Sequence, residues 1–204
     1  MVFRKNAINA GSIKHLDNCT RLLSLDPSQS NDLVHLNDSE FDAIPSFQRL
    51  NLNKRQLSFV SDRTWNALEN LRALDLSHSK FKNFPDFAFS PLRYLQSLFL
   101  SRNSITELNS IPFYGLSSLK ELNLVGCWIV KIDKYCFAQF PNLKSLNLEY
   151  NNIRTLKHKT FQFLKKLQVL ILSQNHLSYI SLILPDSYTA RKIKQKYLYI
   201  LSLL

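Results

Sequence analysis

A 24-residue period runs through most of this chain and constrains its fold more than any other feature. We number the places of each repeat from Leu143, whose place is also held by Phe47, Leu71, Leu95, Leu119 and Leu167. Apolar residues recur at the fourth, sixth and eleventh places. An aromatic residue holds the nineteenth place of every complete repeat: Trp65, Phe89, Phe113, Phe137 and Phe161. A period in the twenties predicts a solenoid in which each repeat forms one coil.

The spacing within a repeat predicts how a coil is built. The pattern L-x-x-L-x-L, as in Leu143, Leu146 and Leu148, puts alternate side chains of a short strand on one face, so these leucines point inward. Asn151 at the ninth place then turns the chain, and its amide can bond the backbone of adjacent coils. One coil cannot bury its own apolar face, so neighbouring coils must cover it. The leucines are therefore predicted to form the core and not a binding site.

With its late phenylalanine, this repeat resembles the leucine-rich repeat family in its 24-residue form, which is typical of extracellular receptors and matrix proteins. Its units are similar to those of Toll-like receptor ectodomains and of small secreted leucine-rich-repeat proteins. The resemblance covers residues 23–180. It implies an α/β fold: a right-handed curved solenoid of six to seven coils, with a parallel β-sheet on the concave face and mostly irregular returns on the convex face.

The repeats suggest three parts of the chain. Residues 1–22 form an N-terminal segment that caps the solenoid poorly, residues 23–180 form the solenoid, and residues 181–204 form a tail outside the repeat. The regular coils begin at residue 47. The first coil, 23–46, has Asp26 and Ser28 where core leucines belong, so it is either degenerate or pairs Leu22, Leu23 and Leu25 in a shifted register. Arg55 and Ser79 replace asparagine at the ninth place, which predicts a weaker polar ladder in the first two regular coils.

Composition bounds the compartment and the partners. The chain has 26 Lys and Arg against 15 Asp and Glu, a net charge of +11, which favours an anionic partner without identifying one. The N-terminus lacks the apolar segment of a signal peptide, and no run is long enough to span a membrane. The three cysteines, Cys19, Cys127 and Cys136, form no C-x-x-C pair, and Cys127 is expected to be buried in the ladder. Asn18 and Asn37 lie in glycosylation sequons that fit an exported protein.

A catalytic role is not predicted. The five histidines have no metal-ligand spacing, and the chain has no Gly-rich phosphate loop. Asp75, Ser77 and His78 are close in sequence, but they are expected on adjacent positions of a solvated strand with no oxyanion hole. We therefore expect no enzyme activity, cofactor or metal.

The concave face is the better candidate site. Outward side chains at the fifth, seventh and eighth places of successive coils should line up in columns. Apolar and aromatic anchors on a polar surface are the composition of binding hot spots. The predicted protein-binding residues are Phe99, Arg102, Val125, Trp128, Tyr150 and Ile171, and a basic patch is predicted at Arg49, Lys54, Arg55 and Lys80.

These features predict a non-catalytic module that binds a protein ligand through the concave face. Nucleic acid is not expected, because the aromatic residues lie mostly apart from the basic ones. By resemblance the chain belongs to a cell-surface or secreted receptor-like protein. The alternative is an intracellular scaffold that uses the same face without export, as the missing signal peptide implies. A glycan at Asn18 or Asn37 would separate the two. The repeat defines neither the ligand nor an oligomeric state.

Overall fold

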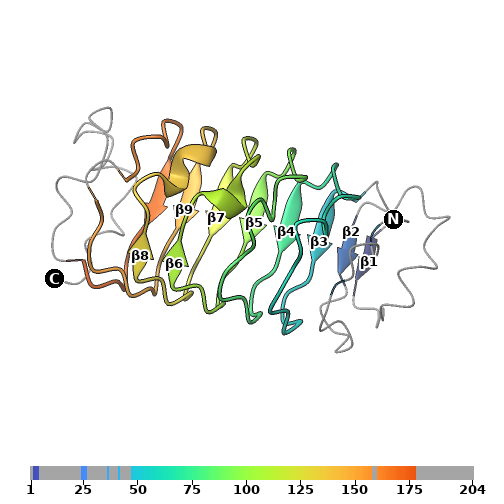
Figure 1. Ribbon diagram of the computed structural model, residues 1–204, viewed down its shortest axis with the longest axis horizontal. Coiled ribbons are helices and arrows are strands. Elements are labelled where there is room, and N and C mark those ends of the chain that lie inside the picture. The colour runs from blue at the N-terminus through green and yellow to red at the C-terminus, as the bar shows by residue number, and fades with distance from the viewer. Residues whose placement is uncertain are drawn as a thin grey trace.

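The computed structural model describes residues 2–4, 24–26, 36, 41, 47–157 and 160–177. Its main feature is a parallel sheet in which every strand pairs with the next one along the solenoid axis (Figure 1). The eight strands of this sheet, in order, are β1 (Val2–Arg4), β2 (Ser24–Asp26), β3 (Arg49–Asn51), β4 (Ala73–Asp75), β5 (Ser97–Phe99), β7 (Glu121–Asn123), β9 (Ser145–Asn147) and β10 (Val169–Ile171).

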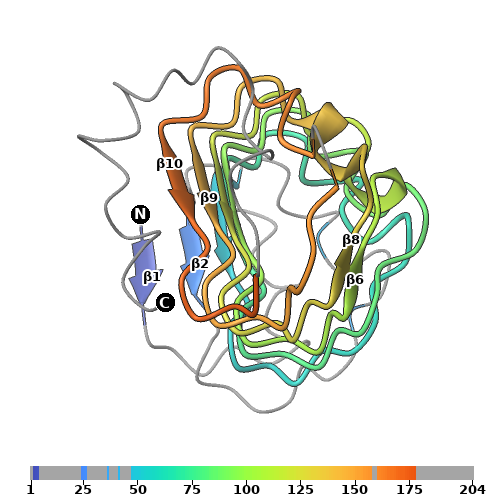
Figure 2. The same ribbon diagram turned by 90° about the vertical axis from the view of Figure 1, so that its left-hand side faces the viewer.

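The return segments close each coil on the side opposite the sheet (Figure 2). They contain two short strands, β6 (Glu107–Leu108) and β8 (Lys131–Ile132), which pair in parallel, and two 3-10 helices, η2 (Ile111–Phe113) and η3 (Cys136–Gln139). The rest of the described return segments is irregular. The predicted leucine-rich-repeat solenoid is therefore confirmed, with a parallel sheet on one side and mostly irregular returns on the other.

Equivalent leucines of successive coils stack inside the solenoid. Leu98 pairs in register with Leu122, and Leu122 with Leu146, and all three are at most 1% exposed. Nineteenth-place aromatics stack in pairs behind them, with 5.8 Å between the ring centroids of Phe89 and Phe113 and 5.4 Å between those of Phe137 and Phe161. Ring pairs at such distances add to the apolar area that each coil buries against its neighbours. The core is continuous through the described coils, as the repeat predicts.

The ninth-place asparagines link neighbouring coils. The Asn151 amide donates to the carbonyl oxygens of Leu124 (2.8 Å) and Leu148 (2.9 Å), and its Oδ1 accepts from the backbone N–H groups of Cys127 (3.1 Å) and Ile129 (2.9 Å). These backbone groups are buried and would otherwise lack partners. The polar ladder that the sequence predicts is confirmed.

The ladder changes where asparagine is replaced. Cys127 is fully buried, and its thiol donates to the Leu100 carbonyl at 3.1 Å, so one of the asparagine bonds is kept. Ser79 is 8% exposed, and its hydroxyl makes no hydrogen bond among the described residues. The prediction of a weaker ladder is confirmed at Ser79.

At the N-terminal end, β2 aligns Leu25 with Leu50 of β3, one residue out of the 24-residue spacing. Leu22 and Leu23, which the shifted register would also involve, lie outside the described residues. β1 then pairs with β2 and aligns Phe3 with Leu25, a strand that the repeat pattern did not predict. The sequons at Asn18 and Asn37, Cys19 and the tail 181–204 lie outside the described residues. Among the described residues, no helix is long and apolar enough to cross a membrane.

Candidate functional site

Polar side chains at the fifth place shape the strand ends. The Asp75 carboxylate accepts the Ser77 N–H at 2.8 Å, and Asn123 and Asn147 accept from Val125 (3.1 Å) and Glu149 (2.9 Å) in the same way. Such Asx turns bend the chain away from the strand. These side chains, predicted only as outward residues of the concave column, therefore have a structural role. The recurrence of Asn or Asp at one place was the signal that sequence reasoning missed.

The eighth place holds a left-handed backbone conformation in every regular coil. The φ angles of the six eighth-place residues lie between 54° and 64°. In each of the first five coils, the eighth-place N–H donates to the next coil, as from Arg102 to the Val125 carbonyl at 2.8 Å. These bonds hold the eighth-place backbones in register, so their side chains form one column. The column comprises Lys54, His78, Arg102, Gly126, Tyr150 and Gln174.

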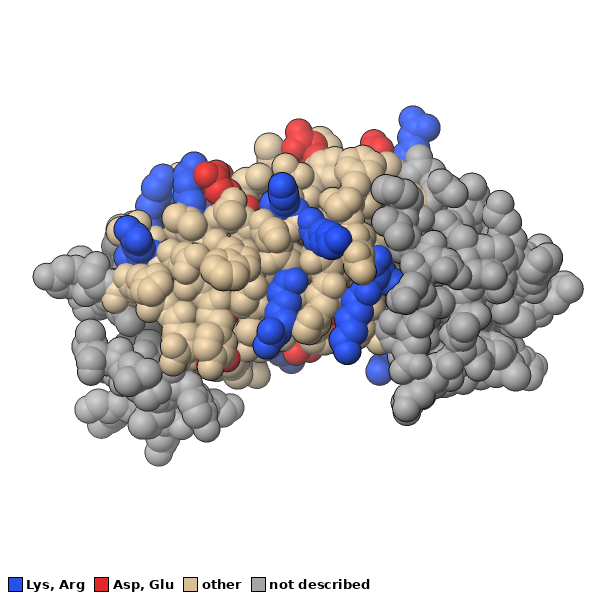
Figure 3. Space-filling view, turned by 90° about the horizontal axis from the view of Figure 1, so that it is seen from below, with Lys and Arg blue, Asp and Glu red and all other residues tan. Residues whose placement is uncertain are grey.

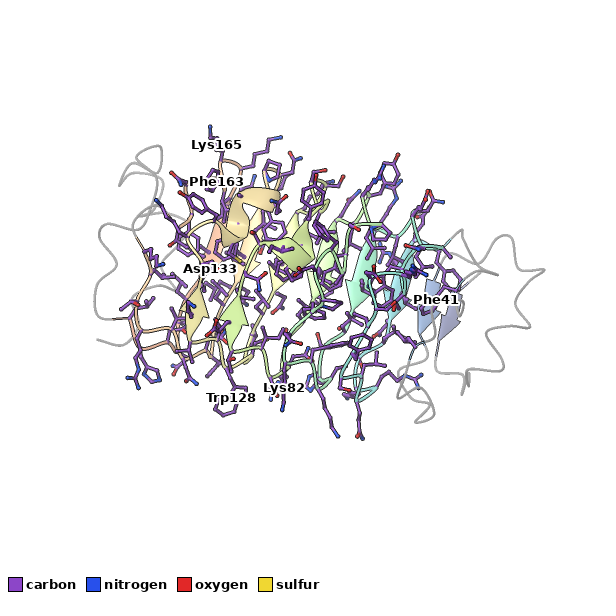
Figure 4. The ribbon with its side chains drawn as sticks, viewed as in Figure 1. Phe41, Lys82, Trp128, Asp133, Phe163 and Lys165 are labelled. Carbon is purple, nitrogen blue, oxygen red and sulfur yellow. The ribbon has the colours of Figure 1, made fainter. Side chains whose placement is uncertain are left out.

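We call the surface formed by the eighth to twelfth places the strand-exit edge, because the chain passes there from the sheet into the return. It is the lower margin of the solenoid in Figure 4, where Trp128 and Lys82 project from it. Figure 3 looks onto the same side from below and shows several Lys and Arg side chains spread across it.

A groove of about 520 Å³ lies in the strand-exit edge, between coils three and six. We call it the edge groove. Its most exposed aromatic residues are Trp128, which is 63% exposed, and Tyr150, which is 59% exposed. Trp128 also has a φ of 67°, a conformation that bulky residues rarely adopt. The groove is lined by Arg102, Val125, Gly126, Trp128, Tyr150, Gln174 and His176, together with four Asn and Ser residues.

The structure divides the predicted protein-binding residues into two groups. Arg102, Val125, Trp128 and Tyr150 line the edge groove together. Phe99 and Ile171 belong to β5 and β10, are only partly exposed on the sheet face, and do not line that groove. The sequence columns placed all six on one surface because they did not show that the backbone turns sharply at the eighth place.

The predicted basic patch needs one correction. Arg49, Lys54 and Lys80 are exposed, but Arg55 is only 3% exposed, because the ninth place points into the ladder. Its charge is therefore not part of the surface.

Two exposed cations at the twelfth place, Lys82 and Arg154, extend the basic surface along the strand-exit edge. Lys131 in the neighbouring return strand is paired with Glu107 at 3.4 Å. Because Arg102 lines the same groove as Trp128 and Tyr150, the expectation that aromatic and basic residues lie apart is wrong at this edge.

A second hollow, of about 950 Å³, lies where the chain enters the sheet. Phe87, Tyr94 and Tyr114 surround it, and the Phe87 and Tyr114 rings meet edge to face at 5.6 Å. Its two charged residues, Glu69 and Arg93, have opposite signs. This hollow therefore lacks the positive character of the strand-exit edge.

The fold and the repeat agree with a known family. The model of the leucine rich repeat matches residues 69–129 and 128–177, and the chain belongs to this family. Its members with solved structures include receptors whose repeats superpose closely on this chain.

The chain is similar to Toll-like receptor 13 of Mus musculus, with 64% identity over 58 residues, which is 28% of this chain and 6% of that receptor. It also matches a solved complex of Toll-like receptor 13 with ssRNA13, with 62% identity and a TM-score of 0.81. That match covers 92% of this chain and 26% of the solved chain, so the sequence spans about a quarter of that relative.

A more distant match is the Toll–Spatzle complex of Drosophila, with 20% identity and a TM-score of 0.69 over 82% of this chain and 22% of that one. At this identity the match shows a shared fold only. The predicted similarity to Toll-like receptor ectodomains is confirmed, and the chain is a receptor-like leucine-rich-repeat module.

The comparison also corrects one expectation about partners. We did not expect nucleic acid as a ligand, yet the relative with 62% identity was solved with single-stranded RNA.

Proposed function

We propose that this chain is a ligand-recognition segment of a Toll-like-receptor type of ectodomain, and that its strand-exit edge binds single-stranded RNA. The proposal is carried by one observation: Arg102, Trp128 and Tyr150 line the same groove on a basic edge. The 62% identity to a receptor solved with RNA supports it.

The chemistry of the edge suits single-stranded nucleic acid. Phosphates are drawn to Lys and Arg, and this attraction supplies most of the sequence-independent affinity. Unpaired bases stack on exposed aromatic rings, with about 1–3 kcal/mol per base. Lys54, Lys80 and Lys82 can contact the backbone of a strand while Trp128 and Tyr150 contact its bases.

The proposal can be tested by fluorescence anisotropy with a labelled 12-nucleotide RNA. We expect the triple variant Lys80→Gln, Lys82→Gln, Arg102→Gln to bind at least about tenfold more weakly, because each lost phosphate contact removes counterion release. A matched variant, Arg93→Gln, Lys144→Gln, Lys165→Gln, removes the same charge from exposed residues outside the strand-exit edge, and its affinity should stay within about twofold. Equal losses in both variants would contradict a site at this edge.

A protein ligand bound through the sheet face is the second candidate. It is favoured by the partly exposed Phe99 and Ile171, which interrupt an otherwise polar fifth-place column. Replacing both with serine should weaken such a complex and leave RNA binding unchanged. If a protein ligand loses its binding only to this double variant, the sheet face is favoured as its binding site.

The resemblance to receptor ectodomains supports a location outside the cell or at its surface. Glycans at Asn18 or Asn37 of the protein from its native host would support export. Fully unmodified asparagines together with reduced cysteines would favour the intracellular scaffold instead. In either compartment the proposed role is recognition and not catalysis.

A further inference from the structure

The eighth-place column has a gap at Gly126. Its neighbours along the column are Arg102 in the coil before and Tyr150 in the coil after, and all three line the edge groove. Every other member of the column is a large side chain. The groove therefore has an opening at Gly126 with a cationic side chain on one side and an aromatic ring on the other.

The backbone does not require glycine at this place. Gly126 has a φ of 64°, but Arg102 and Tyr150 adopt φ values of 56° and 54° at the same place with full side chains. A Cβ built at Gly126 would lie 3.7 Å from Arg102 Cγ and 4.0 Å from the Tyr150 carbonyl oxygen, which is ordinary contact. Glycine is therefore not needed here for the backbone conformation. Its effect is to leave the space of a side chain open.

The width of the opening suits one flat ring. Adjacent parallel strands lie about 4.8 Å apart, so the coils on either side of Gly126 are about 10 Å apart. A ring placed midway would lie about 5 Å from the backbone of each flanking coil. The Arg102 side chain leans toward this space, because its Cγ lies 3.7 Å from the Gly126 Cβ position. Two stacked rings would not fit between the same flanks.

We infer that this opening is a nucleobase slot: one unstacked base of the RNA enters at Gly126 between Arg102 and Tyr150, with Trp128 at the rim. The inference rests on the proposed function. Arginine and tyrosine both stack on the faces of bases, and every base has such a face. The Asn103 and Asn151 amides are already bonded to the backbone within the ladder. These two amides therefore do not read base edges, and stacking on Arg102 and Tyr150 favours a base over a bare phosphate chain.

The test is to fill the slot with Gly126→Gln, because Gln174 holds the same place with a φ of 56°. The probes are a labelled 12-nucleotide oligoadenylate and an abasic 12-mer with the same phosphates. We expect the unmodified chain to bind the oligoadenylate more tightly, and Gly126→Gln to lose about tenfold affinity for it, as expected for one stacked base. Affinity for the abasic strand should stay within about twofold.

Gly126→Ala is the matched control, because a Cβ alone fits and leaves the slot open. Its affinity for both strands should stay within about twofold of the unmodified chain. Equal thermal midpoints of the two variants show that the fold is kept.

A second readout uses fluorescence. The chain has two tryptophans, of which Trp65 is fully buried and Trp128 is exposed, so quenching on RNA binding reports a base near Trp128. We expect quenching with oligoadenylate in the unmodified chain and much less in Gly126→Gln.

The possible failures are distinct. If the unmodified chain binds both strands equally, or if Gly126→Gln binds and quenches like the unmodified chain, the slot is wrong while the proposed RNA binding stands. If neither strand binds the unmodified chain, the proposed function is wrong and the slot with it.

Discussion

Asn151 shows how much of this fold can depend on a single amide. Its side chain satisfies the backbone of three segments, with five hydrogen bonds between 2.8 and 3.2 Å. An unsatisfied buried polar group costs about 1–3 kcal/mol, and Asn151→Leu would leave several such groups. We expect this variant to lower the free energy of unfolding by about 3 kcal/mol or more, measured by urea denaturation. Exposed Asn83 is the matched position, and Asn83→Ala should change it by less than about 0.5 kcal/mol.

The thiol of Cys127 gives a prediction about pH. Burial raises the pKa of Cys127 to about 11 from an ordinary value of 9.0. Between these two values the unfolded chain releases the proton and the folded chain keeps it. This contribution to stability is complete below pH 9 and is lost as the pH rises toward 11, with a slope of up to about 1.4 kcal/mol per pH unit.

Cys127→Ala removes this ionisation and leaves Cys136 and the tyrosines unchanged. Urea denaturation at intervals between pH 8.5 and 11 should therefore show a shallower loss of stability in the variant than in the unmodified chain. Parallel curves would mean that the thiol ionises as easily in the folded chain as in the unfolded one.

At the scale of the coil, stability depends on contacts between neighbours. Leu122 is 1% exposed and lies in register between Leu98 and Leu146. Leu122→Ala should lower stability by about 3–5 kcal/mol, because both neighbouring coils lose contacts and a cavity remains. Hydrogen exchange should accelerate first in β5, β7 and β9. Val130→Ala, at a side chain 49% exposed, should leave exchange in these strands unchanged.

The elements that the sequence predicted best are those that repeat. Leucines at the fourth and sixth places, such as Leu146 and Leu148, define each strand because burial tolerates few alternatives there. The first coil was ambiguous because Leu25, which pairs with Leu50, lies one residue out of the 24-residue spacing. β1 has no repeat pattern of its own, so only pairing with β2 defines it.

The candidate site was only partly predictable for a related reason. Columns of outward residues follow from the period, and three residues of these columns, Arg102, Val125 and Tyr150, line one groove. The left-handed turn at the eighth place has no strong sequence signal, because residues as different as Lys54 and Tyr150 adopt it. Without that turn, the edge groove and the sheet face could not be told apart, and Arg55 could not be assigned to the interior.

For the whole molecule, the net charge of +11 is a source of RNA affinity separate from the local site. A strongly basic protein attracts RNA through its overall field, whether or not it has a site. Direct phosphate contacts differ, because each one adds about −0.7 to the slope of log K against log salt for a single strand. Five contacts at Lys54, Lys80, Lys82, Arg102 and Arg154 would give a slope of about −3.5.

The triple variant at Lys80, Lys82 and Arg102 should reduce that slope to about −1.4, because three of the five contacts are lost. The variant at Arg93, Lys144 and Lys165 has the same net charge, so a general field would make the two variants alike. Anisotropy titrations of the 12-nucleotide RNA at salt concentrations from about 50 to about 300 mM separate the two cases. Unequal slopes of the two variants would mean that the affinity comes from contacts at the strand-exit edge. Equal slopes would mean that it comes from the overall charge of the molecule.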